Sequence, residues 1–370
     1  MPDTMRFLIR FARPEADPRH ERERHLIDDG GRPATLYLPS GPPRPRPAWV
    51  LLQGVTVPGR HHEGVRRMAR ALAAAGHVAV VPEVPSWTAL RVDPRETSPA
   101  ILSALALLRT TREADIARVG LMGFSVAATW ALIAAADLRG ELTTVVGIGG
   151  YADLRRMLRA MVIGEHDWRG RRFRYRPDPY GRWILGADLL PHLDDAQYGT
   201  QQEHEAAADA LHRLAVTAGR NGALADQPVY DDLIADLRGG VPSGALGAWD
   251  LLAPPSAGPV PDGEAGVALA DVLADAALRR HPELDAAGRL DRVDVPVILL
   301  HGRGDRLIPF TESLRLASLL PRATRARVHI TRLIGHAKAE QRPATSPLAA
   351  AREITRFARA ASQILGSVER

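Results

Sequence analysis

Three residues of the chain have the types and the order that nucleophilic catalysis requires. Ser125 lies in the segment Gly-Phe-Ser-Val-Ala at positions 123–127, Asp305 ends the segment His-Gly-Arg-Gly-Asp, and His336 follows a glycine. A serine hydroxyl attacks a carbonyl when a histidine removes its proton, and a carboxylate orients that histidine. Taken singly, each residue has an ordinary explanation: a helix N-cap, a turn residue and a surface loop residue. Their order along the chain turns three weak signals into a strong one.

Each of the three residues lies in a turn or loop that follows a segment with the pattern of a strand. These segments are Arg118–Met122, Val295–His301 and Arg327–Leu333. In open α/β sheets, ligands bind beyond the carboxyl ends of the strands, so we expect the three side chains to converge there. A tight turn between strand and helix would project the Ser125 hydroxyl above the sheet edge.

The order of the remaining elements predicts an α/β fold with a mostly parallel sheet. An N-terminal β-hairpin is expected first, and strands then alternate with amphipathic helices, as parallel pairing requires. The hairpin and further strands are expected at His25–Asp28, Ala34–Leu38, Trp49–Gln53, Val78–Val81 and Thr143–Ile148. The helices are expected at Gly64–Ala75, Ser98–Leu108, Ala127–Ala136, Phe310–Leu320 and Pro347–Leu365.

A long helical segment, 151–290, interrupts this alternation. We therefore expect a leader at 1–22, a core formed by 23–150 and 291–370, and an inserted helical cap between them. The leader is either a docked or a frayed helix. Because the insertion enters and leaves at the edge where the three side chains converge, it should cover them. The alternative is that it packs elsewhere as a separate appendage.

Two segments inside the insertion have distinctive compositions. We expect Trp168–Arg176 to be a solvated hairpin, or else a site for an anionic substrate. We expect the Gly/Pro-rich stretch Gly239–Gly266 to be a hinge or a static loop.

These motifs resemble the alpha/beta-hydrolase family over roughly residues 23–150 and 291–366. The resemblance implies that Ser125 is the nucleophile, Asp305 the acid of a catalytic triad and His336 the general base. It also implies an oxyanion hole formed by the backbone amides of Val55 and Val126. The chain departs from the family pattern at Gln53, where many members have histidine, and at Ala127, where most have glycine.

The function implied is that of a serine hydrolase acting on a carboxylic ester of a small molecule. The alternatives are an amidase, a peptidase or an acyltransferase with the same triad, and a catalytically silent member of the fold that binds a ligand. Gln53, Gly54, Trp87 and Tyr151 are candidates for the substrate pocket, with ordinary packing as the alternative for the two aromatic residues.

The mechanism implied needs no metal and no organic cofactor. His61, His62 and Glu63 could suggest a metal site, but neighbouring histidines point in different directions and no further ligand follows at helical spacing. We expect these residues to form a pocket rim or a helix start instead.

Composition excludes several classes of protein. The 370 residues include no cysteine, which excludes disulfides, thiolate metal sites and a cysteine nucleophile. The net charge is +5, but acidic residues are interspersed with the arginines, so we expect no nucleic-acid partner. No apolar run is long enough to span a membrane, and the first 13 residues are too charged for a signal segment. A cytoplasmic protein is therefore expected; the sequence leaves the oligomeric state open.

Overall fold

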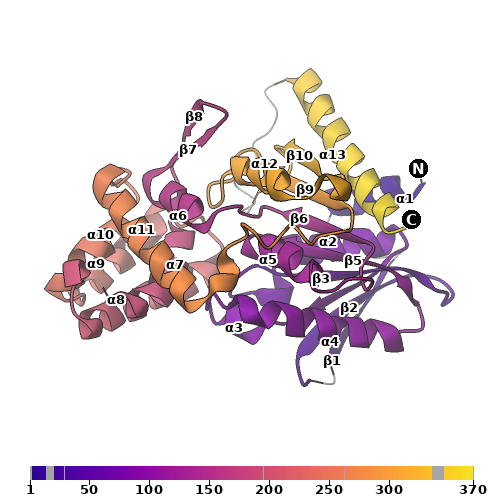
Figure 1. Cartoon of the computed structure of the whole chain (residues 1–370), viewed down its shortest axis with the longest axis horizontal. Coiled ribbons are helices and arrows are strands. Elements are labelled where there is room, and N and C mark those ends of the chain that lie inside the picture. Colours follow the sequence, from indigo (N-terminus) through magenta and orange to yellow (C-terminus); the bar gives the residue numbers. More distant parts are fainter. Residues whose placement is uncertain are drawn as a thin grey trace.

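The computed structural model describes residues 2–13, 21–28, 30–194, 196–261, 263–335 and 346–369. A central sheet has helices on both of its faces, and the helices of the insertion gather beside it at one end (Figure 1). Both chain ends lie on the side away from the insertion. Among the helices of the described residues, none combines the length and the apolar character needed to cross a bilayer.

The sheet contains eight strands within the described residues, in the order β1-β2-β4-β3-β5-β6-β9-β10. β1 and β2 form an antiparallel hairpin, β2 pairs antiparallel with β4, and the other neighbours are parallel. The strands are β1 (Glu21–Ile27), β2 (Pro33–Pro39), β3 (Arg46–Leu52), β4 (Val78–Pro82), β5 (Ala114–Phe124), β6 (Thr144–Ile148), β9 (Val297–Gly302) and β10 (Arg327–Thr331). This topology confirms the alpha/beta-hydrolase fold expected from the sequence.

Two apolar cores fill the faces of the sheet, because side chains of a strand alternate between faces. In β3, Leu51 packs in the core beneath α2 and α13, whereas Val50 and Leu52 pack in the core beneath α4 and α5. Strands buried on both faces read as continuous apolar runs, and every residue of β4 and β6 is buried. The helices outside the insertion are α1 (Pro2–Ala12), α2 (Glu63–Ala74), α3 (Pro85–Thr88), α4 (Thr97–Thr110), α5 (Val126–Ala135), α12 (Phe310–Leu319) and α13 (Pro347–Ser367).

The first helix, α1, is docked on this core. Phe7 is fully buried, and the ring centroid of Phe11 lies 4.8 Å from that of Phe357 in α13. Of the two alternatives for the leader, the described part of it is therefore a docked helix.

The insertion is mainly helical, and its apolar interior is continuous with the core beneath α4 and α5. It also contains the hairpin expected near Trp168, which pairs Glu165 with Arg174 and projects from the body of the molecule (Figure 1). The Gly/Pro-rich stretch after residue 239 is less irregular than expected, because it contains the helix α10. The elements are α6 (Leu154–Ile163), β7 (Glu165–Trp168), β8 (Arg171–Arg174), α7 (Tyr180–Leu189), α8 (Gln201–Asn221), α9 (Asp231–Gly239), α10 (Leu246–Leu252) and α11 (Gly263–Arg280).

Candidate active site

Ser125 occupies a strained turn between β5 and α5. Its backbone has φ 57° and ψ −135°, a conformation that residues other than glycine rarely adopt and that costs about 1–3 kcal/mol. The surrounding sheet holds this conformation: the Ser125 amide donates to the Ile148 carbonyl at 2.8 Å, and the Ser125 carbonyl accepts from the Ala128 amide at 2.9 Å. The next strand, β6, thus fixes one side of the turn and helix α5 the other.

Two glycines allow other backbone segments to approach this turn. A Cβ atom at Gly123 would lie 2.2 Å from the Ala127 carbonyl oxygen, so only glycine fits between β5 and α5. A Cβ atom at Gly54 would lie 3.0 Å from the Ser125 Cβ and 3.6 Å from its Oγ. The loop after β3, which carries Gly54 and Val55, therefore packs directly against Ser125.

Asp305 lies in the loop between β9 and α12, and only 8% of it is exposed. Its Oδ1 accepts from the amides of Leu307 at 3.0 Å and Ile308 at 2.9 Å. Its Oδ2 lies 3.3 Å from His301 Nε2, which also donates to the Ile308 carbonyl at 2.9 Å. Because a carbonyl can only accept, this bond requires a proton on His301 Nε2, and the ring is also held by a hydrogen bond of 2.7 Å between its Nδ1 and the Ser313 hydroxyl. The carboxylate is thus anchored on several sides.

His336 lies outside the described residues. The two residues before it, Ile334 and Gly335, line the same pocket as Ser125 and Asp305. The strand that leads to it, β10, pairs with β9, which leads to Asp305.

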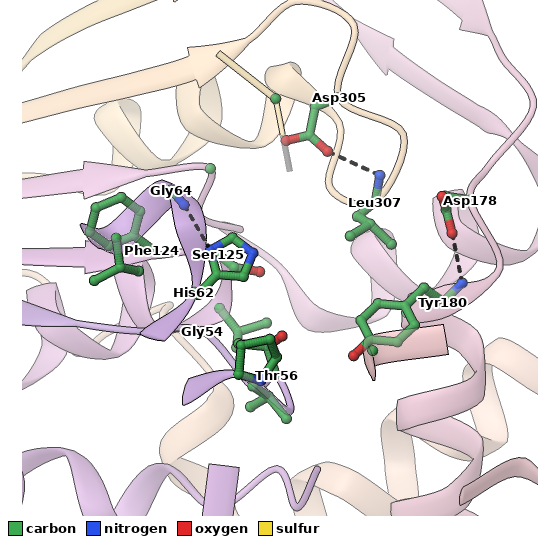
Figure 2. Close-up of a pocket in the computed structure, with 18 of the residues that line it drawn as sticks. Gly54, Thr56, His62, Gly64, Phe124, Ser125, Asp178, Tyr180, Asp305 and Leu307 are labelled. Carbon is green, nitrogen blue, oxygen red and sulfur yellow. Dashed lines mark hydrogen bonds between the residues drawn. The ribbon is translucent and has the colours of Figure 1, made fainter. Parts of the chain in front are cut away.

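Ser125 and Asp305 line one pocket with a volume of about 420 Å³ (Figure 2). The core contributes Gly54, Val55 and Val126, so both of the expected oxyanion residues border this space. Segments of the insertion form other walls. Their pocket-lining residues are Met161, Asp178, Tyr180, Gly181, Ile184, Leu185, Ala218, Gly219, Gly222, Ala223, Leu224 and Ala225.

Two of these insertion residues are polar, and burial dominates the electrostatics of both. Burial raises the pKa of Tyr180 to about 12, while its contacts with Thr56 and Val57 oppose this rise. Burial also raises the pKa of Asp178, opposed by the backbone amides of Tyr180 and Ala225 that donate to its carboxylate. The hydrogen bond from the Tyr180 amide is 2.9 Å long (Figure 2). The Tyr180 side chain thus contacts the loop after β3, whereas the Asp178 carboxylate joins two segments of the insertion.

Three of the four residues expected to line the substrate pocket lie elsewhere. Gln53 is fully buried and faces the end of β4, where its amide can donate to the Pro82 carbonyl at 2.9 Å and accept from the Val84 amide at 3.1 Å. Trp87 donates from Nε1 to the Asp93 carbonyl at 2.8 Å. Tyr151 is fully buried, where its hydroxyl donates to the Leu284 carbonyl at 2.8 Å. Of the four, only Gly54 lines the pocket.

The neighbouring histidines have separate roles, as their sequence spacing suggested. His62 caps helix α2, because its Nδ1 accepts from the Gly64 amide at 3.2 Å, and it also lines the pocket near Ser125 (Figure 2). The ring of His61 instead lies beside that of His25, with 5.9 Å between the centroids. In the described part of the chain, no group of three or more acidic or histidine side chains is arranged to hold a metal ion.

The walls formed by the insertion were not foreseen residue by residue. Nothing in the local sequence around Tyr180 or Leu224 distinguishes a residue that lines the pocket from one that packs in the core. Pocket positions and core positions are alike apolar, and both occur on helices and in the loops between them. Their place depends on how α7 and α8 pack against the loops of the core. From the sequence, only the entry and exit points of the insertion indicated that it would lie over the site.

The chain matches no protein-family model and no curated protein sequence. Several solved structures are similar in arrangement. A 2,6-dihydroxy-pseudo-oxynicotine hydrolase is 16% identical, with a TM-score of 0.48 over 96% of this chain and 70% of that chain. Est1E from Butyrivibrio proteoclasticus, in a structure with bound ferulic acid, is 11% identical, with a TM-score of 0.47 over 94% of this chain and 100% of that chain. An acylaminoacyl peptidase from Pyrococcus horikoshii is 12% identical, with a TM-score of 0.46 over 95% of this chain and 42% of that chain. At these values the likenesses carry no information about substrate.

Proposed function

We propose that this protein is a serine hydrolase that cleaves a carboxylic ester through an acyl-enzyme on Ser125. The observation that carries the proposal is the strained backbone of Ser125 at a pocket that the anchored carboxylate of Asp305 also lines. A strained residue other than glycine persists only where its surroundings hold it, and such residues cluster at active sites. An ordinary helix N-cap needs no positive φ, so this feature separates the catalytic interpretation from the structural one.

In the proposed mechanism, His336 in its neutral form removes the proton of the Ser125 hydroxyl as the oxygen attacks the ester carbonyl. The imidazolium then gives this proton to the leaving alcohol as the bond between carbonyl carbon and alcohol oxygen breaks. Water, activated by the same histidine, attacks the acyl-enzyme and releases the acid. Asp305 orients the ring and stabilises its charged form.

The amides of Val55 and Val126 are the proposed donors to the oxyanion. The close approach of Gly54 to Ser125 supports the first, and the position of Val126 at the start of α5 supports the second, because the helix dipole favours negative charge there. One such donor contributes about 3 kcal/mol to transition-state stabilisation in related enzymes.

We also propose that the insertion acts as a cap that selects substrates. The walls it contributes are mostly small or apolar, which suits the uncharged acyl or alcohol group of an ester better than an ionic group. The reactive groups and the selecting walls therefore come from different parts of the chain.

The direct test of the proposal is labelling by a fluorophosphonate, followed by mapping of the labelled peptide. We expect one label per chain on Ser125, no label on the Ser125→Ala variant, and hydrolysis of esters in preference to matched amides. Ser318→Ala, which removes an exposed hydroxyl on α12, is the matched control and should label normally. Labelling of Ser125 combined with faster amide cleavage would keep the serine mechanism and replace the ester by an amide substrate.

A further inference from the structure

We propose that Arg306 is a positioning residue that fastens the loop of Asp305 to the insertion, so that the insertion helps to set the geometry of the catalytic acid. This inference rests on the proposed function of the same site. It follows from the contacts of Arg306, which directly follows Asp305 and does not line the pocket.

Arg306 contacts two separate segments of the insertion. Its carbonyl accepts from the Asp178 amide at 3.1 Å, and its Nε donates to the Arg176 carbonyl at 2.8 Å. These two bonds join it to the segment between β8 and α7. Its Nη2 donates to Asp226 in the segment after α8. The guanidinium thus links two insertion segments to the loop of the acid.

The ion pair between Arg306 and Asp226 is more buried than the surface pairs of the insertion. The two side chains are 20% and 12% exposed, compared with 48% and 50% for the pair of Arg238 with Asp250. Solvent screens a partly buried pair less than an exposed one, so this pair holds its geometry more firmly.

The position of Arg306 couples these contacts to the carboxylate. Asp305 Oδ1 accepts hydrogen bonds from the amides of Leu307 and Ile308, so the side chain of Asp305 closes a turn of its own backbone. Arg306 is the residue of that turn that directly follows Asp305. Leu307 is also packed against the insertion, since a Cβ atom at Gly181 would lie 3.2 Å from its Cδ2. A displacement of the Arg306 backbone would move the Leu307 amide, and the carboxylate would move with it.

The chemical consequence is a change in the rate of acylation rather than in substrate binding. A catalytic group displaced by about 1 Å through a distant change can lose about 100-fold in rate. Arg306 does not itself line the pocket, and its hydrogen bond with the pocket residue Asp178 is made by main-chain atoms that Arg306→Ala retains, so loss of the side chain should leave the walls that bind substrate in place.

The test measures kcat and KM of the full-length protein with one ester for Arg306→Ala and Asp226→Ala, separately and together. We expect kcat to fall about tenfold in each single variant, with KM within twofold of the wild-type value. The double variant should have the same kcat as Arg306→Ala alone, because Asp226→Ala breaks a contact that Arg306→Ala has already removed. Arg238→Ala, which removes the exposed pair, is the matched control and should keep the wild-type kcat.

A second arm repeats Arg306→Ala in an Asp305→Asn background. We expect less than a twofold further loss, since the carboxylate that Arg306 positions is then absent. An equal tenfold loss in both backgrounds, or an unchanged kcat in Arg306→Ala, would overturn the inference. Fluorophosphonate labelling of the same samples keeps the two proposals apart: absence of labelling of wild-type Ser125 contradicts the proposed function, whereas labelling of the wild type with an unchanged rate in Arg306→Ala contradicts the positioning role alone.

Discussion

The core and the insertion hold their parts of the site by different means. In the core, the sheet fixes main-chain segments: Ser125 is set by hydrogen bonds to β6 and α5, and Gly123 admits no side chain at all. In the insertion, side chains do much of the fastening, as in the pair of Arg159 with Asp271, where the two nitrogen–oxygen distances are 2.7 and 2.6 Å. The difference suggests that the chemistry depends on backbone geometry, which tolerates little change, while selectivity depends on side chains that can be exchanged.

After loss of the nucleophile itself, the largest expected effect is the loss of the acid in the core. Asp305→Asn should lower kcat/KM by about 10³–10⁴-fold, because an amide does not stabilise the charged imidazole and favours the wrong tautomer. Steady-state kinetics with an activated ester measure this loss. The insertion offers a matched control in Asp271→Asn, which weakens an ion pair away from the pocket. An Asp305→Asn enzyme as active as this control would show that another residue is the acid.

Glycine substitutions compare the tolerance of the two regions. Gly123→Ala should destabilise the fold by about 3 kcal/mol or more, because the new Cβ meets backbone atoms that cannot move aside. Gly239→Ala, at the end of α9, has no atom within 4 Å of its new Cβ and should be neutral or stabilising by up to about 1 kcal/mol. Urea unfolding measures the change in the free energy of unfolding for both variants. Equal destabilisation of the two would contradict the expected difference between the core and the insertion.

A buried histidine makes the stability of the core depend on pH. Burial lowers the pKa of His77 to about 4, and its Nδ1 accepts from Trp49 Nε1 at 3.1 Å. Below about pH 6.5 the unfolded chain binds a proton that the folded chain does not, so the free energy of unfolding should fall as the pH decreases, by about 2 kcal/mol between pH 7 and pH 4.5. His77→Asn should be less stable at pH 7 but should show a flatter dependence over this interval.

Urea unfolding at several pH values tests this prediction. A slope unchanged in His77→Asn would show that the acid sensitivity arises from other groups.

The smallest expected effects are changes in selectivity caused by the insertion. Ala218→Leu should fill part of the pocket and lower kcat/KM for long acyl chains about tenfold relative to acetyl esters, while Leu224→Ala should shift the preference the other way. A series of esters of increasing chain length measures both. The rate of labelling by a small fluorophosphonate should stay the same; if it fell with the selectivity, the insertion would act on the chemistry through these residues too.

The sequence predicted the core better than the insertion for a physical reason. Short apolar runs such as Val78–Val81, which lies between Gly76 and Pro82, are strongly determined by local pattern. The ends of two other such strands, β5 and β9, locate Ser125 and Asp305. The pocket walls depend on how helices far apart in sequence pack together, which local pattern does not encode. Proximity to a strand end was therefore misleading for Tyr151, whose ring turns inward to meet Trp130 and the Leu284 carbonyl.

The same limit applies to Arg306. In the sequence Arg306 is one arginine among many, and Asp226, its ion-pair partner in the structure, lies 80 residues away along the chain. Only the packing of the insertion against the core brings the two side chains together. The role of His336 stays a prediction from the sequence.

The most direct test of the account is to trap the acyl-enzyme. The full-length protein would be mixed with a slowly hydrolysed ester, quenched within one turnover, and examined by intact mass and peptide mapping. We predict one acyl group per chain, on the peptide that contains Ser125, and neither adduct nor turnover with Ser125→Ala. Turnover by a folded Ser125→Ala protein at the wild-type rate, or wild-type turnover with no acyl group on Ser125, would contradict the central claim.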